Sequence, residues 1–397
     1  MEYNLKILMV CTEYPPMHGG IGRYTNNLVN ALRKLNNDVH VCCGNEGKGE
    51  YTKLSPYHSH NSNILLEVVD HLRPDIVHIQ MEYGLYGFKH NPILPLKMTS
   101  SLESFYSGCH TPIITTFHSS YHFKQWLGLV SVKQPKWNIK KIAEYWRRIV
   151  SYRAFHELNK RIIQKSSANI VCSDFLSRLI PGSKVIYHGA NSYSSQNVSK
   201  QEARTKLSLP LDSKIALAQG FFTSTKGWDI INQMNIPDDW RIVLNHSKNH
   251  YSKQRFNLPF ITNNNKNKII NLNKKYLSEY ELSLLFYASD VVLLPYKVCS
   301  GSGVMFDAIG HGTPFISSDL DFFKEFTEMN LGIMVKRHQN EFVKALKYID
   351  ANYSSYTSSI EKFKKQLDWN KIATQHLEIY MDLLKISSSN KEKPLLI

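Results

Sequence analysis

Short apolar runs alternate with amphipathic segments along the chain, and the whole series occurs twice. The runs are too short for buried helices and are typical of strands buried on both faces of a parallel sheet. In the first half the predicted strands are 5–11, 39–43, 75–79, 113–117, 169–172 and 185–187, with helices at 23–35 and 64–72. In the second half they are 215–220, 241–244, 269–271, 290–295 and 314–317. The sequence therefore predicts two α/β domains, each with a doubly wound parallel sheet.

The predicted domain boundary lies in the stretch 189–199, which is rich in Asn and Ser and lacks apolar periodicity. A chain of 397 residues is also too long for one ordinary core. We predict a first domain over 1–188, a linker over 189–199, a second domain over 200–368, and a terminal segment over 369–397 with a helical pattern at 369–384. Residues 245–268, crowded with Asn, Lys and His, are predicted to form a long exposed insertion.

Composition excludes several classes of protein. Hydrophobic residues make up 42% of the chain, which excludes a disordered protein. The six cysteines form no C-x-x-C pair, so neither a zinc site nor a disulfide framework is predicted and a reducing cytoplasm is expected. No apolar stretch reaches about 18 residues, so the chain is expected to be soluble or peripheral to a membrane.

A net charge of +15 is concentrated in residues 124–165, here called the basic segment. It holds eleven Lys and Arg against Glu144 and Glu157, which accounts for nine of the fifteen charges. Tryptophans interrupt these charges, a pattern that an anionic membrane surface attracts. The predicted membrane or acceptor contacts are Trp126, Trp137, Lys140, Lys141, Arg147 and Arg148.

The alternative is an ordinary helix pair, in which the charges are solvated and Ile142, Trp146, Ile149 and Val150 turn into the core. Both interpretations of the basic segment stay open on the sequence. Nucleic-acid binding is not favoured, because it requires a basic groove lined with stacking aromatics instead of phosphate loops.

Two glycine-containing loops join predicted strands to predicted helices. In the first, Gly19, Gly20 and Gly22 allow close backbone approach beside free helix amides, which suits a phosphate. It is not an NAD fingerprint, since it lacks G-x-G-x-x-G and no acidic residue ends the next strand. A plain turn is the alternative for this loop.

The second loop precedes a helix that carries Asp307, and its backbone amides are placed to cradle a diphosphate. The predicted diphosphate contacts in this loop are Ser300, Gly301, Ser302 and Gly303. Lys226 follows the strand 215–220 and is expected to neutralise the same phosphates.

Five motifs in the same order resemble landmarks of the retaining glycosyltransferases of family 4, which have the GT-B fold. They are Gly19-Gly20-Ile21-Gly22-Arg23, Thr116-Phe117-His118, Lys226-Gly227-Trp228-Asp229, the stretch 289–295 and the stretch 307–314. The stretch 78–84 is similar to a Q-x-E-Y-G signature found in part of the family, and 369–373 is similar to its terminal segment.

This resemblance implies two Rossmann-like domains facing a cleft, with acceptor bound by the first and nucleotide-sugar donor by the second. It implies that the terminal helix returns to the first domain. It also implies donor binding by both loops together with Lys226 and Asp307, and catalytic roles for His118, Lys226 and Asp307. The expected reaction is transfer of a sugar, of hexosyltransferase type, with retention of configuration and without a metal or other cofactor.

The chain departs from the family pattern at two positions. Phe221 stands where the donor site commonly has an Arg, and Cys299 stands where the first Glu of the E-x7-E pattern is expected. Asp307 replaces the second Glu and is one methylene shorter. A catalytically silent, nucleotide-sugar-binding subunit of a glycosylation complex is therefore the alternative function.

The expected partners are a nucleotide-sugar donor and a glycan acceptor. If the acceptor is lipid-linked, the inner face of the plasma membrane is the expected place of action for this cytoplasmic protein. Asp319-Leu320-Asp321 matches the D-x-D metal motif of another glycosyltransferase class, but it follows a strand of the second domain, out of that context. No metal site is therefore predicted.

Overall fold

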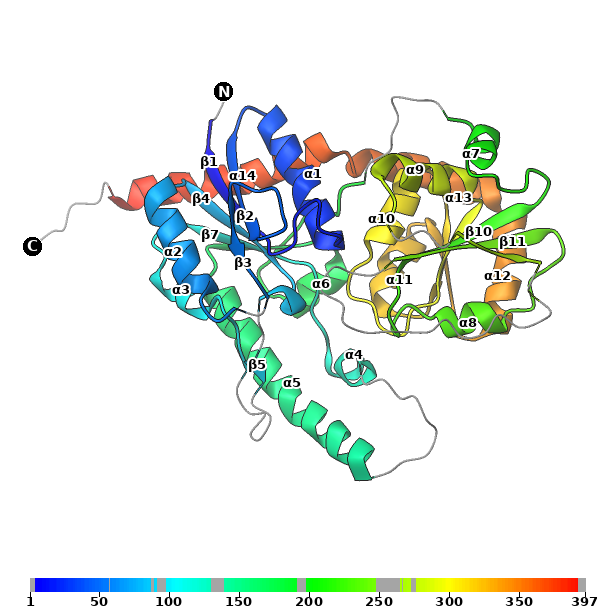
Figure 1. Cartoon of the computed structure of the whole chain (residues 1–397), viewed down its shortest axis with the longest axis horizontal. Helices are drawn as coiled ribbons and strands as arrows, with labels where there is room; N and C mark the ends of the chain where they lie inside the picture. The colour runs from blue at the N-terminus through cyan, green and yellow to red at the C-terminus, as the bar shows by residue number, and fades with distance from the viewer. Residues whose placement is uncertain are drawn as a thin grey trace, which may run out of the picture. The chain divides into compact units, whose positions relative to one another are not determined.

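The computed structural model describes residues 4–56, 58–86, 89–90, 98–129, 139–190, 198–247, 265, 267–272 and 276–391. The chain divides into two compact units (Figure 1). Unit 1 comprises Met1–Tyr187 and Trp369–Ile397, and unit 2 comprises His188–Asp368. Unit 2 is thus inserted between two stretches of the chain that pack together.

Unit 1 is built on a seven-stranded sheet with the order β3-β2-β1-β4-β7-β8-β9, in which every neighbouring pair is parallel. The chain moves outward from β1 to β3 and then restarts at β4 on the other side, so the order reverses between β1 and β4. The strands are β1 Lys6–Val10, β2 Asp38–Gly44, β3 Tyr51–Leu54, β4 Ile76–Met81, β7 Ile113–Phe117, β8 Ala168–Val171 and β9 Lys184–Val185. A separate antiparallel pair joins β5 Lys89–His90 to β6 Met98–Thr99.

The helices of unit 1 lie in the connections between its strands, except for α14, which follows unit 2 in the chain (Figure 1). They are α1 Gly20–Lys34, α2 Asn61–Leu72, α3 Glu103–Gly108, α4 Phe123–Gly128, α5 Ile139–Lys165, α6 Asp174–Leu179 and α14 Trp369–Lys391, with a 3-10 turn η1 at Tyr83–Leu85. In α1 the buried Tyr24, Leu28 and Leu32 recur every four residues, which places them on one helix face against the sheet. Arg33 and Lys34 in its last turn complement the helix dipole.

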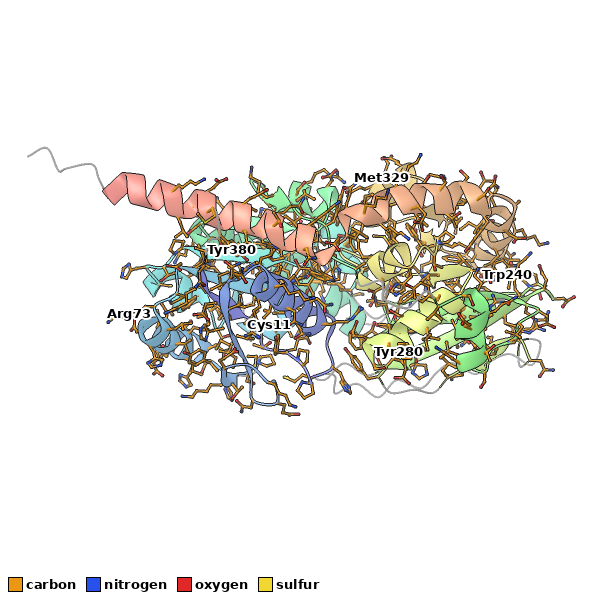
Figure 2. All side chains as sticks on the ribbon, turned by 90° about the horizontal axis from the view of Figure 1, so that it is seen from above. Cys11, Arg73, Trp240, Tyr280, Met329 and Tyr380 are labelled. Atoms are coloured by element: carbon orange, nitrogen blue, oxygen red, sulfur yellow. The ribbon has the colours of Figure 1, made fainter. Side chains whose placement is uncertain are left out.

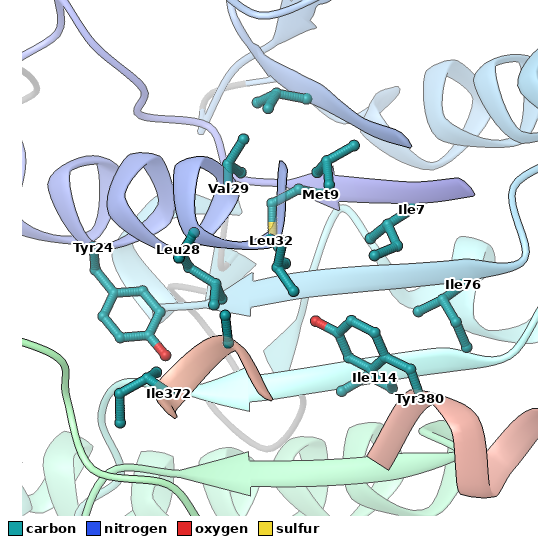
Figure 3. Close-up of a cluster of buried hydrophobic side chains, with 14 of the residues drawn as sticks. Ile7, Met9, Tyr24, Leu28, Val29, Leu32, Ile76, Ile114, Ile372 and Tyr380 are labelled. Carbon is teal, nitrogen blue, oxygen red and sulfur yellow. The ribbon is translucent and has the colours of Figure 1, made fainter. Parts of the chain in front are cut away.

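The terminal helix α14 completes the core of unit 1. Trp369, Ile372 and Tyr380 pack in one buried cluster with residues of α1 and of the central strands (Figure 3). Ile372 is 1% exposed and Tyr380 is fully buried, although they lie more than 300 residues from β1. Figure 2 shows Tyr380 where α14 crosses unit 1. The core of unit 1 therefore requires the end of the chain.

Unit 2 repeats the same construction with a six-stranded parallel sheet of order β12-β11-β10-β13-β14-β15. Its strands are β10 Lys214–Phe221, β11 Trp240–Ser247, β12 Ile269–Asn271, β13 Val291–Leu294, β14 Phe315–Ser318 and β15 Gly332–Val335. Its helices are α7 Lys200–Lys206, α8 Trp228–Gln233, α9 Glu279–Ala288, α10 Gly303–Gly310, α11 Asp321–Glu328, α12 Gln339–Ala351 and α13 Tyr353–Phe363, followed by a 3-10 turn η3 at Lys364–Gln366. The predicted class, two doubly wound parallel sheets, is confirmed.

Two short edge strands and one predicted insertion differ from the expectation. β3 and β15 were not predicted, and each has only one buried residue. The β3 sequence YTKL lacks a continuous apolar run, whereas the β15 sequence GIMV has one that the sequence interpretation missed. The predicted insertion 245–268 begins too early, because 245–247 continue β11 and pair with β10. Residues 248–264 and 266 of that stretch, and 191–197 of the predicted linker, lie outside the described residues.

Among the described residues, every helix is too short or too polar to cross a bilayer. The longest one, α5, has 27 residues and a charged sequence. It extends well beyond the sheet of unit 1 (Figure 1).

Truncating Ile372 to Ala is expected to lower the free energy of unfolding of unit 1 by about 2 to 5 kcal/mol, because it leaves a cavity between α14 and α1. Urea denaturation followed by circular dichroism measures this change. Gln375→Ala, on the exposed face of the same helix, is the matched control and is expected to stay within about 0.5 kcal/mol of the parent. Equal effects of the two variants would contradict the assigned role of α14.

Candidate functional site

Lys226 lies at the carboxyl edge of the unit 2 sheet, in the loop between β10 and α8. Its Nζ is 3.9 Å from the centre of the Tyr296 ring, which follows β13. β10 and β13 are parallel neighbours, so their following loops meet at the same edge of the sheet. The Lys226 Cε and the Val304 Cγ2 both lie 3.9 Å from the position that a Cβ on Gly220 would take. The Lys226 side chain is thereby placed beside the first turn of α10.

The N-terminus of α10 carries the predicted serine and glycine loop. Ser302 caps the helix, and its Oγ accepts a hydrogen bond from the Met305 amide at 3.2 Å. The first amides of an α-helix have no partner within it and form its positive end. Ser300, Gly301, Ser302 and Gly303 therefore surround a helix end that suits an anion, and Lys226 is near enough to act electrostatically on Cys299 at the start of the same loop. The structure brings these five predicted residues together.

Gly227 and Arg337 hold the Lys226 loop in place. Gly227 has a φ of +77°, and a Cβ there would lie 1.8 Å from the carbonyl oxygen of Pro295. The same oxygen accepts a hydrogen bond from Arg337 Nε at 3.0 Å, while Arg337 Nη2 contacts Asp229 Oδ1 at 2.7 Å. Arg337 thus joins the loop after β13 to the start of α8.

Cys299 and Asp307 occupy the two positions where the family pattern has glutamates. Cys299 is 4% exposed, and burial raises the pKa of its thiol to about 12 although the nearby Lys226 ammonium opposes this. The thiol is therefore neutral at physiological pH and cannot replace a carboxylate. Asp307 lies in α10 with its side chain 3% exposed. Its predicted role in donor binding and catalysis stays a prediction.

In unit 1, the first glycine loop holds an internal carboxylate. The amides of Ile21 and Gly22 donate to Glu13 Oε1 at 2.8 and 3.2 Å, so Glu13 lies on the N-terminus of α1. A Cβ on Gly19 would be 2.0 Å from the Glu13 Cδ, and one on Gly22 would be 2.8 Å from the Glu13 carbonyl oxygen. Gly19 and Gly22 are thus required to accommodate Glu13. Donor binding by Gly19, Gly20 and Gly22 stays a prediction, and this arrangement does not favour a phosphate beside a buried carboxylate.

His118 lies at the carboxyl end of β7 and is 8% exposed. Its Nε2 is 2.8 Å from Gln80 Oε1 on the neighbouring strand β4. The Tyr24 ring of α1 packs edge-on against the imidazole, with 4.8 Å between the ring centres. The predicted catalytic histidine is therefore held at the sheet edge by two side chains from other elements.

The basic segment separates into buried and exposed parts. Trp126 is 8% exposed, stacks on Phe155 at 4.5 Å and donates its indole N–H to the Arg148 carbonyl at 3.0 Å. It joins α4 to α5 and is unavailable for membrane insertion, so its predicted membrane role is corrected. The alternative interpretation is also wrong in part, because Trp146 is 62% exposed instead of packed in the core.

The other predicted membrane contacts have different outcomes. Arg147 is exposed, and the Arg148 guanidinium lies 5.8 Å from the Trp126 ring centre. Trp137 and the side chains of Lys140 and Lys141 lie outside the described residues. Among the described side chains of α4 and α5, the exposed large apolar ones are Phe123, Ile142, Tyr145 and Trp146.

No group of three or more His, Cys, Asp or Glu side chains suited to a metal occurs in the part of the chain that the structure describes. Asp319 lies in the turn after β14, and Asp321 is the first residue of α11.

Several residues at these sites were missed by the sequence interpretation. Tyr296 and Arg337 lie in loops without a motif, so only the fold brings them to Lys226. His188 lies near the α10 N-terminus, with its ring stacked on Phe306 and its Nε2 3.5 Å from the Cβ position of Gly303. Gln80 belongs to the quoted Q-x-E-Y-G stretch, which was the one available signal.

Comparisons with known proteins agree with this architecture. Residues 18–185 match the sequence model described as Glycosyltransferase Family 4, which covers less than half of the chain. Comparison with curated protein sequences gives no match.

Solved glycosyltransferase structures resemble the whole chain. Sucrose-phosphate synthase from Thermosynechococcus elongatus is 17% identical with a TM-score of 0.67, covering 96% of this chain and 99% of that one. HepE of Anabaena in complex with UDP and glucose is 13% identical with a TM-score of 0.60, covering 96% and 100%. WaaG, a glycosyltransferase involved in lipopolysaccharide biosynthesis, is 14% identical with a TM-score of 0.60, covering 94% and 99%. At these identities the similarity establishes the fold, and the predicted GT-B class is confirmed.

Replacing Gly227 by Ala is expected to destabilise unit 2 by more than the about 1 to 2 kcal/mol that a left-handed backbone costs an L-residue. The additional cost comes from the clash with the Pro295 carbonyl oxygen. Thermal unfolding of the variant measures the total. Gly312→Ala is the matched control, because Gly312 has a φ of +80° and its Cβ would meet only Glu361 Oε1 at 3.5 Å. If both variants lose the same stability, the close approach to Pro295 is not significant.

Proposed function

We propose that this chain is a glycosyltransferase that moves a sugar from a nucleotide-diphosphate sugar to a glycan acceptor. The observation that carries the proposal is the placement of Lys226 beside the N-terminus of α10, at the carboxyl edge of the unit 2 sheet. In open α/β sheets, ligands bind at this edge. An ammonium group next to a positive helix end is chemically suited to a diphosphate.

The reaction chemistry follows from the charge that develops when the glycosidic bond breaks. The leaving nucleoside diphosphate gains negative charge, and the sugar ring gains positive charge. Lys226 and the first amides of α10 are fixed donors that stabilise the leaving group without having to reorganise. We infer that the reaction needs no metal, because these groups meet the phosphate charge. Retention of configuration rests on the resemblance to family 4.

The donor and acceptor classes rest on similar proteins. HepE is found in complex with UDP and glucose, and WaaG is described as acting in lipopolysaccharide biosynthesis. A nucleotide-sugar donor and a lipid-linked glycan acceptor are accordingly the classes proposed for this chain, with the cytoplasm as the proposed location.

Phe221 and Cys299 define the alternative function. The neutral Cys299 thiol lacks the charge with which a glutamate would bind the donor sugar. A silent nucleotide-sugar-binding subunit would bind donor without hydrolysing or transferring it. Lys226 and the α10 end would bind the diphosphate in either case, so donor hydrolysis by the purified chain distinguishes the two functions.

Lys226→Ala is expected to weaken binding of a nucleoside diphosphate by about 10-fold to 150-fold, which corresponds to a charge-assisted contact of about 1.5 to 3 kcal/mol. The measurement is calorimetric titration with UDP, ADP and GDP in excess chelator. Lys324→Ala, which removes an exposed lysine of α11, is the control and is expected to bind as the parent does. An unchanged dissociation constant for Lys226→Ala would exclude Lys226 from the site, and a requirement for manganese would overturn the metal-free proposal.

Contact with an anionic membrane is the second part of the proposal and now rests on exposed residues. Phe123, Ile142, Tyr145 and Trp146 are 42%, 45%, 38% and 62% exposed on α4 and α5. Lys124 and Arg147 are exposed on the same two helices. Aromatic side chains among cationic ones suit the headgroup region of a bilayer.

The chain is expected to bind phosphatidylglycerol liposomes more tightly than phosphatidylcholine liposomes, and less tightly as salt rises. Trp146→Ser is expected to weaken binding about 10-fold, and Lys124→Glu with Arg147→Glu to weaken it further by about 1 kcal/mol or more per residue. Tyr348→Ser, which removes an aromatic side chain that is 53% exposed on α12, is the matched control. Retention that is equal for the parent, Trp146→Ser and the charge reversals would contradict membrane contact through this surface.

A further inference from the structure

A chain of buried polar side chains runs from the terminal helix to His118 through the sheet of unit 1. Tyr380 Oη is 2.6 Å from His78 Nδ1, and His78 Nε2 is 3.2 Å from Gln80 Nε2. Gln80 Oε1 is in turn 2.8 Å from His118 Nε2. Tyr380, His78 and Gln80 are fully buried, so each of their polar atoms depends on a protein partner.

The orientation of the Gln80 amide follows from the chemistry of its neighbours. Its Nε2 lies 3.1 Å from the Met9 sulfur, which can only accept a hydrogen bond. The amide nitrogen therefore faces Met9, and the oxygen faces His118. Since an amide oxygen only accepts, His118 donates from Nε2, and this ring nitrogen therefore carries a proton.

His78 is consistent with the same assignment. Burial keeps the pKa of His78 well below its usual value, so the ring is neutral and carries one N–H. Its Nε2 faces the Gln80 amide nitrogen and the Thr116 hydroxyl at 2.7 Å, and therefore accepts. Its proton is then on Nδ1, directed to Tyr380 Oη. The Gln80 amide thus sets the tautomer of His78, and the Tyr380 hydroxyl of α14 accepts from the Nδ1–H that results.

We propose that Gln80 is a positioning residue that holds the His118 imidazole in one orientation and in the Nε2–H tautomer. This inference rests on the proposed function for the catalytic role of His118. Gln80 itself touches no substrate in this scheme. It acts through its bond to Nε2, while Tyr24 packs edge-on against the imidazole, and the two contacts fix the orientation of the ring. In the Nε2–H tautomer the other ring nitrogen, Nδ1, is a hydrogen-bond acceptor.

The first test is spectroscopic and does not depend on activity. In protein labelled with 15N-histidine, the His118 signals, identified by their loss in His118→Gln, are expected to show a protonated Nε2 and an unprotonated Nδ1. Gln80→Leu removes the acceptor and is expected to give mixed tautomers, whereas Gln80→Glu keeps an acceptor and the Nε2–H form. A protonated Nδ1 with unprotonated Nε2 in the parent protein, or an unchanged pattern in Gln80→Leu, would overturn the proposal.

The second test is a double-variant cycle with the transfer or donor-hydrolysis reaction. Gln80→Leu is expected to lower kcat about 10-fold to 100-fold and to leave the KM for donor within about threefold of the parent value. A misplaced catalytic group slows the chemical step but does not weaken donor binding. The double variant Gln80→Leu with His118→Ala is expected to be no slower than His118→Ala alone. Independent, multiplying losses would show that Gln80 does not act through His118 and would overturn the proposal.

Tyr106→Phe is the matched control, since it removes another buried hydrogen bond of unit 1, between the Tyr106 and Thr115 hydroxyls at 2.8 Å, and leaves the Gln80–His118 bond in place. Its kcat is expected to equal that of the parent. If the parent protein neither transfers nor hydrolyses any nucleotide sugar, the proposed function fails, while the tautomer measurement still decides the role of Gln80. Should Gln80→Leu not fold, Gln80→Glu and the parent spectrum test the same bond.

Discussion

Parallel strand pairing is the constraint on which the rest of this structure depends. Every neighbouring pair in both large sheets is parallel, so all carboxyl ends of a sheet lie at one edge and each connection must cross a face. Residues far apart in the sequence, such as Lys226 after β10 and Tyr296 after β13, come together only because of this rule. The same rule brings Gln80 of β4 to His118 after β7. Both proposed sites are thus products of strand order.

The two glycine loops show how similar sequences acquire different environments. Each precedes a helix and therefore its positive end, and each contains glycines that allow close backbone approach. At α1 that end is already neutralised by Glu13, whose carboxylate accepts two backbone amides. At α10 the N-cap is an uncharged serine, and a lysine ammonium lies beside the first turn. The electrostatic difference favours an external anion at α10 and an internal one at α1.

Hydrogen bonding and burial also determine the structural roles of single residues. Trp126 is an interhelical anchor because its indole N–H has a carbonyl partner and its ring is stacked, whereas Trp146 on α5 is largely exposed. Cys299 is a neutral thiol because burial outweighs the nearby ammonium. Tyr380 shows the same principle at longer range, since the end of the chain supplies both a core side chain and a hydrogen-bond partner for His78.

The sequence by itself determined the fold class and most inner strands, because continuous apolar runs and their alternation with helices depend only on local patterns. It also indicated the α10 loop and Lys226 as candidates for phosphate binding, since glycines and serines between a strand and a helix allow close backbone approach and helix capping. Their role in donor binding stays a prediction. The edge strand β3 escaped prediction because its sequence YTKL lacks a continuous apolar run. Only the tertiary structure decided that Glu13 lies on the first loop, that Arg337 joins the loops around Gly227, and that Gln80 holds His118. These contacts join residues that are separated in the sequence and are brought together by sheet topology. Their hydrogen-bond partners and their burial therefore depend on the fold and not on their spacing in the sequence.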